Sequence, residues 1–178
     1  GVLYDKVCRE DVLRSAYAQV RANRGPPGVD QQSFEAIEKG IGVDSFLSEL
    51  RQRLISKRYK PLPVRRVFIR KGDGTQRPLG IPVITDRVVQ AAVKIVIEPL
   101  FEAIFKDFSY GFRPRKNANQ ALWQVYKWLN FKCHWVVDAD LKSYFDTIPH
   151  DKLLLSVKTR VTVRSVAKLI AMGLKVGG

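Results

Sequence analysis

The sequence predicts an α+β fold that is mainly helical, with one basic β-hairpin and one acidic strand. Three observations lead to this prediction. Apolar residues recur at helical spacing along most of the chain, a period-two stretch surrounds Gly72-Asp73-Gly74, and a short apolar run at 135–141 contains two aspartates. The chain has 178 residues, of which 46% are hydrophobic and 27% charged, so it can bury a core.

Helices are expected in the first third of the chain. "EDVLRSAYAQVRAN" (10–23) has apolar residues at helical spacing, and the prolines and glycines of "RGPPGVD" (24–30) end that helix. A short helix is expected from Ser33 to Lys39. Asp44 is the expected N-cap of the helix that follows. The apolar positions of this next helix are Phe46, Leu47, Leu50 and Leu54.

The middle of the chain changes from helical to strand periodicity. "VRRVFIRK" and "TQRPLGIP" flank Gly72-Asp73-Gly74, where glycine permits the positive φ of a tight turn, so a hairpin is expected. Pro78 has no N–H for a ladder bond, which indicates an edge strand. Thr85 is expected to cap a long helix through Glu98, and Pro99 is expected in the first turn of another helix.

The last third contains a loop, a strand and further helices. "YGFRPRK" (110–116) is an expected basic loop, and Asn117 is expected to cap an amphipathic helix. The strand at 135–141 follows, Pro149 starts a helix that contains "LLLSV", and a last helix is expected from about Val163 to Leu174. The apolar face of the amphipathic helix comprises Ala118, Ala121, Leu122, Val125, Tyr126 and Leu129.

The positive charge belongs to one region of the chain. Residues 1–50 have a net charge of −2, whereas residues 51–178 have a net charge of +16. Ten basic residues and a single acid, Asp73, lie between Arg51 and Arg77. Such a field favours a polyanion, most often nucleic acid. A solvated basic surface and a contact with an anionic membrane are the alternatives.

Cysteine usage and hydropathy indicate the compartment. Cys8 and Cys133 are the two cysteines, and their separation predicts neither a disulfide framework nor a zinc site but suits a reducing compartment. The most apolar segment, "VVQAAVKIVIEPLFEAIF", is interrupted by charges and a proline and is expected to be a core helix, not a membrane span. No signal-peptide pattern is present, so a cytoplasmic location and no membrane partner are expected.

The acidic strand suggests a metal site. Successive side chains of a strand point to opposite faces, so Asp138 and Asp140 are expected on the same face, opposite a wholly apolar one. Carboxylates at a strand end are costly unless they are hydrogen-bonded, paired or metal-bound, and hard oxygen ligands suit Mg²⁺. Alternatively, these acids belong to a turn, with Lys142 paired to either one and Asp146 capping the next helix. The backbone N–H groups of 142–144 could bind a phosphate.

Four stretches of the chain resemble the group II intron reverse transcriptases, also called maturases. They are "RGPPGVD", "YKPLPVRRVFIRKGDGTQRPLGIPVITDRVVQAAV", "FSYGFRPRKNANQAL" and "WVVDADLKSYFDTIPHDKLL", in that family's order and together covering about residues 20–178. The resemblance implies a truncated right-hand polymerase, with the fingers and the first segment of the palm. It implies an N-terminal extension and first fingers helices at 1–60, fingers at 61–131 and a partial palm with motif A at 132–178.

The resemblance also implies roles for individual residues. Asp140 would be the catalytic aspartate of motif A, and with the carbonyl of Leu141 it would bind two Mg²⁺ ions that later parts of such a protein help to hold. Phe145 would be the steric gate that selects deoxynucleotides. The remaining nucleotide-binding residues would be Lys71, Arg77, Ser143 and Tyr144. The RNA-binding residues would be Arg65, Arg66, Arg70, Arg113, Arg115 and Lys116.

Some aromatic residues have two interpretations. Tyr110 and Phe112 could stack on bases or anchor their loop, and anchoring is favoured. Trp123 and Trp128 are expected to be core or partly exposed helix positions, not platforms for bases.

The implied function is an RNA-directed DNA polymerase of a group II intron, with roles in RNA splicing and retromobility. Its partners would be intron RNA, an RNA template with a DNA primer, and dNTP. The sequence lacks the family's Tyr-x-Asp-Asp and Pro-Gln-Gly motifs, so the chain is expected to be an N-terminal part that binds RNA but does not polymerise alone. It could also form a homodimer through apolar palm surface. The alternatives are an RNA-binding splicing module without polymerase activity and a retron-like or CRISPR-associated reverse transcriptase.

Overall fold

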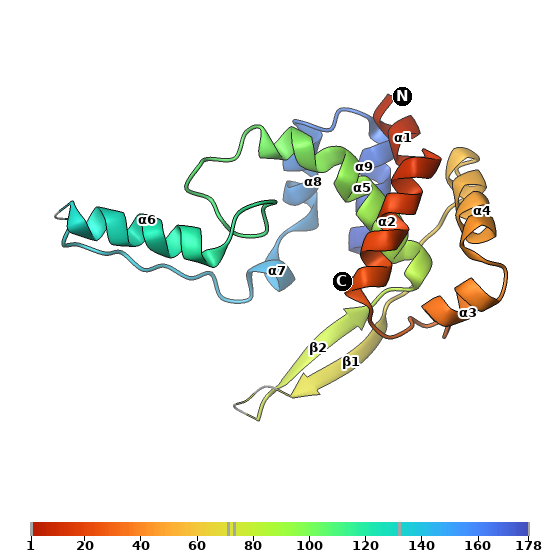
Figure 1. The fold of residues 1–178 in the computed structure, drawn as a ribbon, viewed down its shortest axis with the longest axis horizontal. Coiled ribbons are helices and arrows are strands. Elements are labelled where there is room, and N and C mark those ends of the chain that lie inside the picture. Colours follow the sequence, from red (N-terminus) through yellow and green to blue (C-terminus); the bar gives the residue numbers. More distant parts are fainter. Residues whose placement is uncertain (1, 71, 73, 132, 178) are drawn as a thin grey trace. The chain divides into compact units, whose positions relative to one another are not determined.

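The computed structural model describes residues 2–70, 72, 74–131 and 133–177, which form helices and one small antiparallel sheet (Figure 1). The chain divides into two compact units, residues 1–97 with 149–178, and residues 98–148. The helices are α1 (Val2–Val7), α2 (Glu10–Asn23), α3 (Phe34–Lys39), α4 (Val43–Ile55), α5 (Ile84–Glu102), α6 (Ala118–Asn130), α7 (Tyr144–Thr147), α8 (His150–Lys158) and α9 (Arg164–Gly177). The strands are β1 (Arg65–Arg70) and β2 (Gln76–Ile81).

The first unit has a helical core. The apolar residues of α2 and α4 recur at helical spacing, so each helix buries one stripe, and α2 packs against both α1 and α4. Tyr17 lies between the rings of Phe34 and Phe46, with centroids 6.1 and 5.9 Å away. Further packing joins α3 to α4, α1 to α9, and α8 to α9. The helices predicted for residues 10–23, 33–39 and 163–174 are confirmed, whereas α1 and α7 were not predicted.

The N-terminal cap predicted for α4 is wrong. Asp44 lies inside the first turn of α4, after the N-cap Gly42, whose φ of 82° brings its N–H to within 2.9 Å of the Ile37 carbonyl. The carboxylate of Asp44 instead accepts a 2.7 Å hydrogen bond from Arg14. At α3 the N-cap is Ser33, whose hydroxyl accepts a hydrogen bond from Ala36 N–H at 3.0 Å.

The predicted hairpin is confirmed. Strands β1 and β2 pair antiparallel, with Arg65 opposite Ile81 and Arg70 opposite Gln76. Pro78 lies opposite Phe68 in this pairing, and its missing N–H costs little in a two-stranded ribbon because each strand has an outer edge. Gly74 has a φ of 83°, the conformation that the turn prediction required of glycine.

The helix that follows the hairpin is longer than predicted, and the predictions for Thr85 and Pro99 are wrong. Helix α5 begins at Ile84, and Arg87 N–H already bonds the Val83 carbonyl at 3.1 Å, so Thr85 lies within the first turn. Pro99 lies inside α5, which continues to Glu102. A proline removes one backbone donor, but the turns after it can still bond, as Ala103 N–H does to the Pro99 carbonyl at 3.3 Å.

The second unit contains the largest departures from prediction. Asn117 caps α6 as expected, in a capping box with Gln120. However, α6 buries none of its described side chains, and the segment 135–141 is not a strand, with Trp135 96% exposed. A strand needs a neighbouring backbone for its N–H and C=O groups, and the described residues place no strand beside this segment. The predicted burial of its apolar face is therefore wrong.

No helix among the described residues is long and apolar enough to cross a membrane.

Candidate nucleic-acid and nucleotide site

The hairpin presents cations on both of its faces. Residues directly opposite each other in an antiparallel pair share a face, so Arg77 lies on the face of Ile69, its cross-strand neighbour. Arg66 and Arg70 lie on the opposite face with Phe68, because side chains alternate along the strand. Arg70 and Arg77 are exposed. Lys71, the other predicted triphosphate ligand, lies outside the described residues.

The "RGPPGVD" loop holds the base of the hairpin. Arg65 Nε donates a 3.0 Å hydrogen bond to the Pro27 carbonyl. Arg87, in the first turn of α5, donates to the Pro82 carbonyl at 2.8 Å and to the Pro26 carbonyl. Burial lowers the pKa of Arg87. In this structure the Arg65 guanidinium anchors the hairpin, and its predicted RNA contact stays a prediction.

A buried carboxylate completes this anchor. Asp86 is 2% exposed and accepts hydrogen bonds from the Tyr59 hydroxyl at 2.7 Å and from Leu62 N–H at 2.9 Å. Burial raises the pKa of Asp86, because a carboxylate loses hydration in the interior, although the two donors lower it. These two bonds hold the chain before β1 against the start of α5.

Several cations of the basic stretch before the hairpin have structural contacts. Arg51 Nε donates to the Cys8 carbonyl at 3.1 Å, and the Lys57 ammonium lies 3.0 Å from the centroid of the Tyr4 ring. Arg53 lies 5.9 Å from the centroid of the Tyr59 ring. Cation–π contacts of this kind stabilise a fold. The positive charge counted in the sequence is therefore not all available to a polyanion.

Arg113 makes the hydrogen bonds that hold the Gly-Phe-Arg-Pro loop in its conformation. Its side chain is 6% exposed, and it donates to both carboxylate oxygens of Glu102, with a shortest distance of 2.6 Å. It also donates to the carbonyls of Lys106 and Ser109, at 2.6 and 2.8 Å. The hydrogen bond from Arg113 lowers the pKa of Glu102. The guanidinium thus organises the loop in this structure, and its predicted RNA contact stays a prediction.

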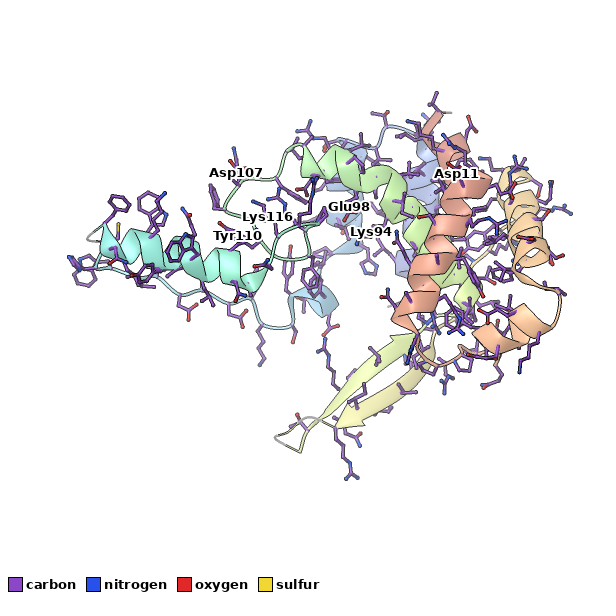
Figure 2. The ribbon with its side chains drawn as sticks, viewed as in Figure 1. Asp11, Lys94, Glu98, Asp107, Tyr110 and Lys116 are labelled. Atoms are coloured by element: carbon purple, nitrogen blue, oxygen red, sulfur yellow. The ribbon has the colours of Figure 1, made fainter. Side chains whose placement is uncertain are left out.

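The other residues of this loop differ in exposure. Lys116 donates to the Asp107 carbonyl at 3.1 Å and lies 5.3 Å from the centroid of the Tyr110 ring, so Tyr110 helps to anchor the loop (Figure 2). Arg115 is exposed and has a φ of 60°. Phe112 is 91% exposed, so the loop offers one cation and one ring to solvent.

The loop and the acidic segment meet at two aromatic rings. Phe145 lies edge to face with Phe112, with ring centroids 5.9 Å apart and an interplanar angle of 82°. Ser143 adopts the left-handed conformation, with a φ of 51°, and starts the short helix α7. Its carbonyl accepts from Asp146 N–H and Thr147 N–H, both at 3.1 Å. This turn holds Tyr144 and Phe145 at the surface, four and five residues after Asp140.

The donors for a metal ion are present only in part. Asp138 and Asp140 are exposed in the unpaired segment 133–141, and the Leu141 carbonyl follows them. Among the described residues, no group of three or more histidine, cysteine, aspartate or glutamate side chains could hold a metal ion. One or two carboxylates and a carbonyl are hard oxygen donors of the type that Mg²⁺ uses together with substrate phosphates. The donor chemistry fits Mg²⁺, but these residues do not complete a site.

Sequence reasoning missed the residues that position these features. Tyr59, Asp86, Arg87 and Glu102 were given no role, although each makes a hydrogen bond or an ion pair that holds the hairpin or the loop. An aspartate two residues after the start of an apolar helix, among valines, was the available signal for Asp86. The pairing of Arg113 with Glu102 had no such signal in the sequence.

The comparison with known families defines the class of this protein. Residues 69–177, more than half of the chain, match the family described as reverse transcriptase (RNA-dependent DNA polymerase). The chain therefore belongs to the reverse transcriptase family, which generally uses Mg²⁺. The match contains the acidic segment, α7 and the Gly-Phe-Arg-Pro loop described above.

Individual relatives narrow this assignment. Protein YkfC of Escherichia coli (strain K12) is 39% identical over 155 residues, covering 85% of this chain and 40% of YkfC. Group II intron-encoded protein LtrA of Lactococcus lactis subsp. cremoris is 33% identical over 183 residues, covering 98% of this chain and 29% of LtrA. Nuclear intron maturase 1, mitochondrial, of Arabidopsis thaliana is 32% identical over 95 residues, covering 53% of this chain and 13% of that protein. LtrA and the intron maturase confirm the resemblance to the group II intron reverse transcriptases and maturases. This chain spans less than half the length of each of them.

Proposed function

We propose that this chain is the fingers and the first palm segment of an RNA-directed DNA polymerase of a group II intron, with the boundaries 1–60, 61–131 and 132–178. The observation that carries the proposal is the contact between Phe112 and Phe145, with centroids 5.9 Å apart. It joins two motifs that the sequence identified independently, and both lie within the family match at 69–177. The wider roles would be those of intron RNA binding, splicing and retromobility.

Asp140 is the proposed catalytic residue. Its carboxylate and the Leu141 carbonyl would hold Mg²⁺, and further carboxylates would come from the length of the relatives that this chain does not span. Two bound Mg²⁺ ions supply activation of the attacking primer oxygen and stabilisation of the leaving pyrophosphate. Exposure of Asp140 supports this role, because a metal and a substrate can approach it.

Nucleotide selection is assigned to the turn after Asp140. The Phe145 ring, 69% exposed and braced by Phe112, would exclude a ribose 2′-hydroxyl. The backbone of Ser143 and Tyr144 would contact the dNTP. Lys71 and Arg77 of the hairpin would neutralise its triphosphate, because cations aimed at phosphate oxygens stabilise the charge that develops there.

RNA binding is assigned to the cations of the hairpin and the loop. Arg66 and Arg70 lie on the hairpin face opposite Arg77, so the two faces can bind different anions, template on one and triphosphate on the other. Arg65, Arg113, Arg115 and Lys116 are the further proposed RNA contacts, of which Arg115 is exposed. The partners are intron RNA and an RNA template with a DNA primer. Exposed apolar side chains of the proposed palm segment, such as Trp135 and Val137, are a surface through which two copies could pair.

Primer extension by the product of the parent gene tests the enzymatic assignment. Asp140→Asn is expected to lower dNTP incorporation with Mg²⁺ by more than about a hundredfold, since loss of even outer metal partners costs 10–100-fold. Asp146→Asn is the matched control, because Asp146 is an exposed acid in the following turn. Phe145→Val is expected to raise ribonucleotide incorporation relative to deoxynucleotide incorporation. Full activity of Asp140→Asn would refute the proposed site.

A splicing module without polymerase activity is the second candidate. The observation that favours it is the incomplete donor set, since the described residues contain no cluster of three metal-ligating side chains. Asp140→Asn and its control Asp146→Asn also distinguish a splicing module from a polymerase. A splicing module would retain stimulation of intron splicing in Asp140→Asn and would show no primer extension in any variant. A polymerase would lose extension in Asp140→Asn alone.

A further inference from the structure

The end of the chain forms a second basic region that none of the roles above uses. Asp151 is the last acidic residue, and six basic residues follow it. They lie in α8, in α9 and in the connection between them. Only Lys152 has an acid beside it in sequence, so the six cations create a positive potential that attracts a polyanion. The six are Lys152, Lys158, Arg160, Arg164, Lys168 and Lys175.

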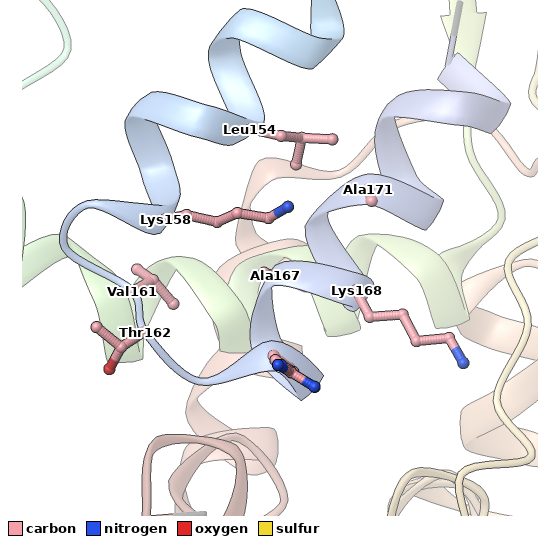
Figure 3. A pocket seen from close by; sticks show the side chains of 8 residues that line it. Leu154, Lys158, Val161, Thr162, Ala167, Lys168 and Ala171 are labelled. Carbon is pink, nitrogen blue, oxygen red and sulfur yellow. The ribbon is translucent and has the colours of Figure 1, made fainter.

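A cavity of about 530 Å³ lies against α8 and α9 in this region (Figure 3). Its volume is within the range of roughly 300–1,000 Å³ that is typical of ligand sites. Three of its lining residues are the cations Lys158, Arg164 and Lys168, and Thr162 adds a hydroxyl. Leu154, Val161, Ala167 and Ala171 provide an apolar floor. None of the described residues that line the cavity is acidic.

Local structure places these cations around the turn between α8 and α9. The buried Val161 donates its N–H to the Val157 carbonyl at 2.8 Å, so the chain turns tightly after α8 and α9 packs back against it. Arg164 and Lys168 are four residues apart on α9 and therefore lie on the same side of the helix. Figure 3 shows Lys158 extending from α8 toward α9, whereas Lys168 extends from α9 away from Lys158.

This arrangement is unfavourable without an anion. Like charges four residues apart on a helix repel each other. Arg164 is the first residue of α9, where the helix dipole is positive, and the first turn of α9 contains no acid. Within the described part of the chain, no carboxylate forms an ion pair with Lys158, Arg164 or Lys168. A bound phosphate would relieve each of these costs.

We propose that the α8–α9 cavity binds the sugar-phosphate backbone of RNA, as a contact site additional to the hairpin and the Gly-Phe-Arg-Pro loop. The inference rests on the proposed function, because it takes RNA to be the polyanion that the chain binds. Lysine and arginine donate charge-assisted hydrogen bonds to phosphate oxygens, and the Thr162 hydroxyl can donate another. The separated ammonium groups of Lys158 and Lys168 suit successive phosphates of one strand, as in grooves that follow single-stranded nucleic acid. The apolar floor suits the sugar.

A matched pair of charge variants tests this proposal. Lys158→Gln, Arg164→Gln and Lys168→Gln together remove the cations of the cavity. Lys152→Gln, Arg160→Gln and Lys175→Gln together remove three exposed cations of the same region that do not line it. Binding of the 178-residue chain to a fluorescein-labelled oligouridine is measured by anisotropy over a series of salt concentrations. The cavity variant is expected to reduce the slope of log K against log salt by about 2, at ~0.7 for each lost phosphate contact, and the control by much less.

Each outcome decides the proposal. An equal loss in both variants would mean that the region acts only through its overall charge, and it would refute a site in the cavity. No loss in either variant, with wild-type binding intact, would also refute the site but leave the proposed function standing. A wild-type chain that does not bind RNA would refute both.

A lysine-protection experiment on the wild-type chain tests the same proposal without the cavity variant, in case that variant does not fold. Lysines of the wild-type chain are acetylated with and without oligouridine, and the modified positions are identified by mass spectrometry. RNA is expected to protect Lys158 and Lys168 but not Lys152 and Lys175. Equal protection of all four would refute the cavity as a site.

Discussion

At the scale of single residues, the polar side chains that matter most for stability are the ones that hold the hairpin in place. Asp86 is buried, and both of its carboxylate oxygens accept hydrogen bonds that tie residues 59–62 to the start of α5. A buried carboxylate is tolerated only when its hydrogen bonds are made. If the Asp86 carboxylate is removed, the Tyr59 hydroxyl and the Leu62 N–H lose their acceptor, and this loss destabilises the folded state.

Asp86→Ala is expected to lower the free energy of unfolding by about 2–4 kcal/mol, because it leaves the Tyr59 hydroxyl and Leu62 N–H without an acceptor. Urea denaturation followed by circular dichroism measures the change. Asp44→Ala is the matched control, because Asp44 is exposed and pairs with Arg14, and a change within about 1 kcal/mol is expected. Equal effects of the two substitutions would contradict the role given to Asp86.

The same residue gives stability a pH dependence of defined sign. Burial raises the pKa of Asp86 above the value of about 3.9 that an aspartate has in an unfolded chain. The folded state therefore binds the proton more tightly, and the contribution of Asp86 is most favourable below that value. It declines as the pH rises through the raised pKa. This part of the pH dependence is absent from Asp86→Ala, as paired denaturation series across acidic pH would show.

At the scale of elements, the hairpin depends on a close approach between the "RGPPGVD" loop and the chain that leads into α5. A Cβ atom added to Gly28 would lie 2.6 Å from the backbone nitrogen of Val83 and 2.7 Å from its Cα. Backbone atoms at such distances must move apart. The loop carries the Pro26 and Pro27 carbonyls that bond Arg87 and Arg65, so the movement would reach the base of the hairpin.

Gly28→Ala is expected to lower the free energy of unfolding by about 1–3 kcal/mol, the usual cost of overpacking. Gly72→Ala is the control, since a Cβ there has no neighbour within 4 Å. Thermal unfolding of both variants measures the difference. An unchanged unfolding temperature in Gly28→Ala would contradict this prediction, because the loop could then move away from Val83 without a loss of stability.

At the scale of the whole molecule, the charge of +14 predicts binding to RNA that weakens with salt. Much of this charge has other partners, since Arg113 pairs with Glu102 and Lys57 lies over Tyr4. The exposed arginines of the hairpin are therefore expected to contribute a larger share of the RNA affinity than their share of all the basic residues in the chain.

Arg66→Gln with Arg70→Gln, on the hairpin face proposed for the template, is expected to reduce the salt slope for oligouridine by about 1.4, corresponding to two phosphate contacts at ~0.7 each. Lys6→Gln with Lys39→Gln is the control, because it removes the same charge from two exposed positions away from the hairpin. Anisotropy titrations at several salt concentrations supply the slopes. Equal slopes for the two double variants would show that the hairpin is no preferred contact.

Local physics explains which predictions from sequence are confirmed. The hairpin, the Asn117 cap and the helix at 10–23 depend on residues close in sequence, through glycine conformation, capping hydrogen bonds and apolar spacing. The reverse transcriptase family was also identified from short motifs, since their order and spacing are properties of the sequence itself.

Long-range contacts were decided only by the tertiary structure. Three such contacts join residues 11 or more positions apart. They are the ion pair of Arg113 with Glu102, the hydrogen bond from Tyr59 to Asp86 and the ring contact of Phe112 with Phe145. The segment 135–141 is the opposite case, since its apolar alternation predicted a strand but pairing needs a neighbouring backbone, and none of the described strands lies beside it. The sequence by itself thus determined the local elements and the family. The tertiary structure decided which polar groups are paired and which segments are covered, because both depend on what the rest of the chain brings into contact.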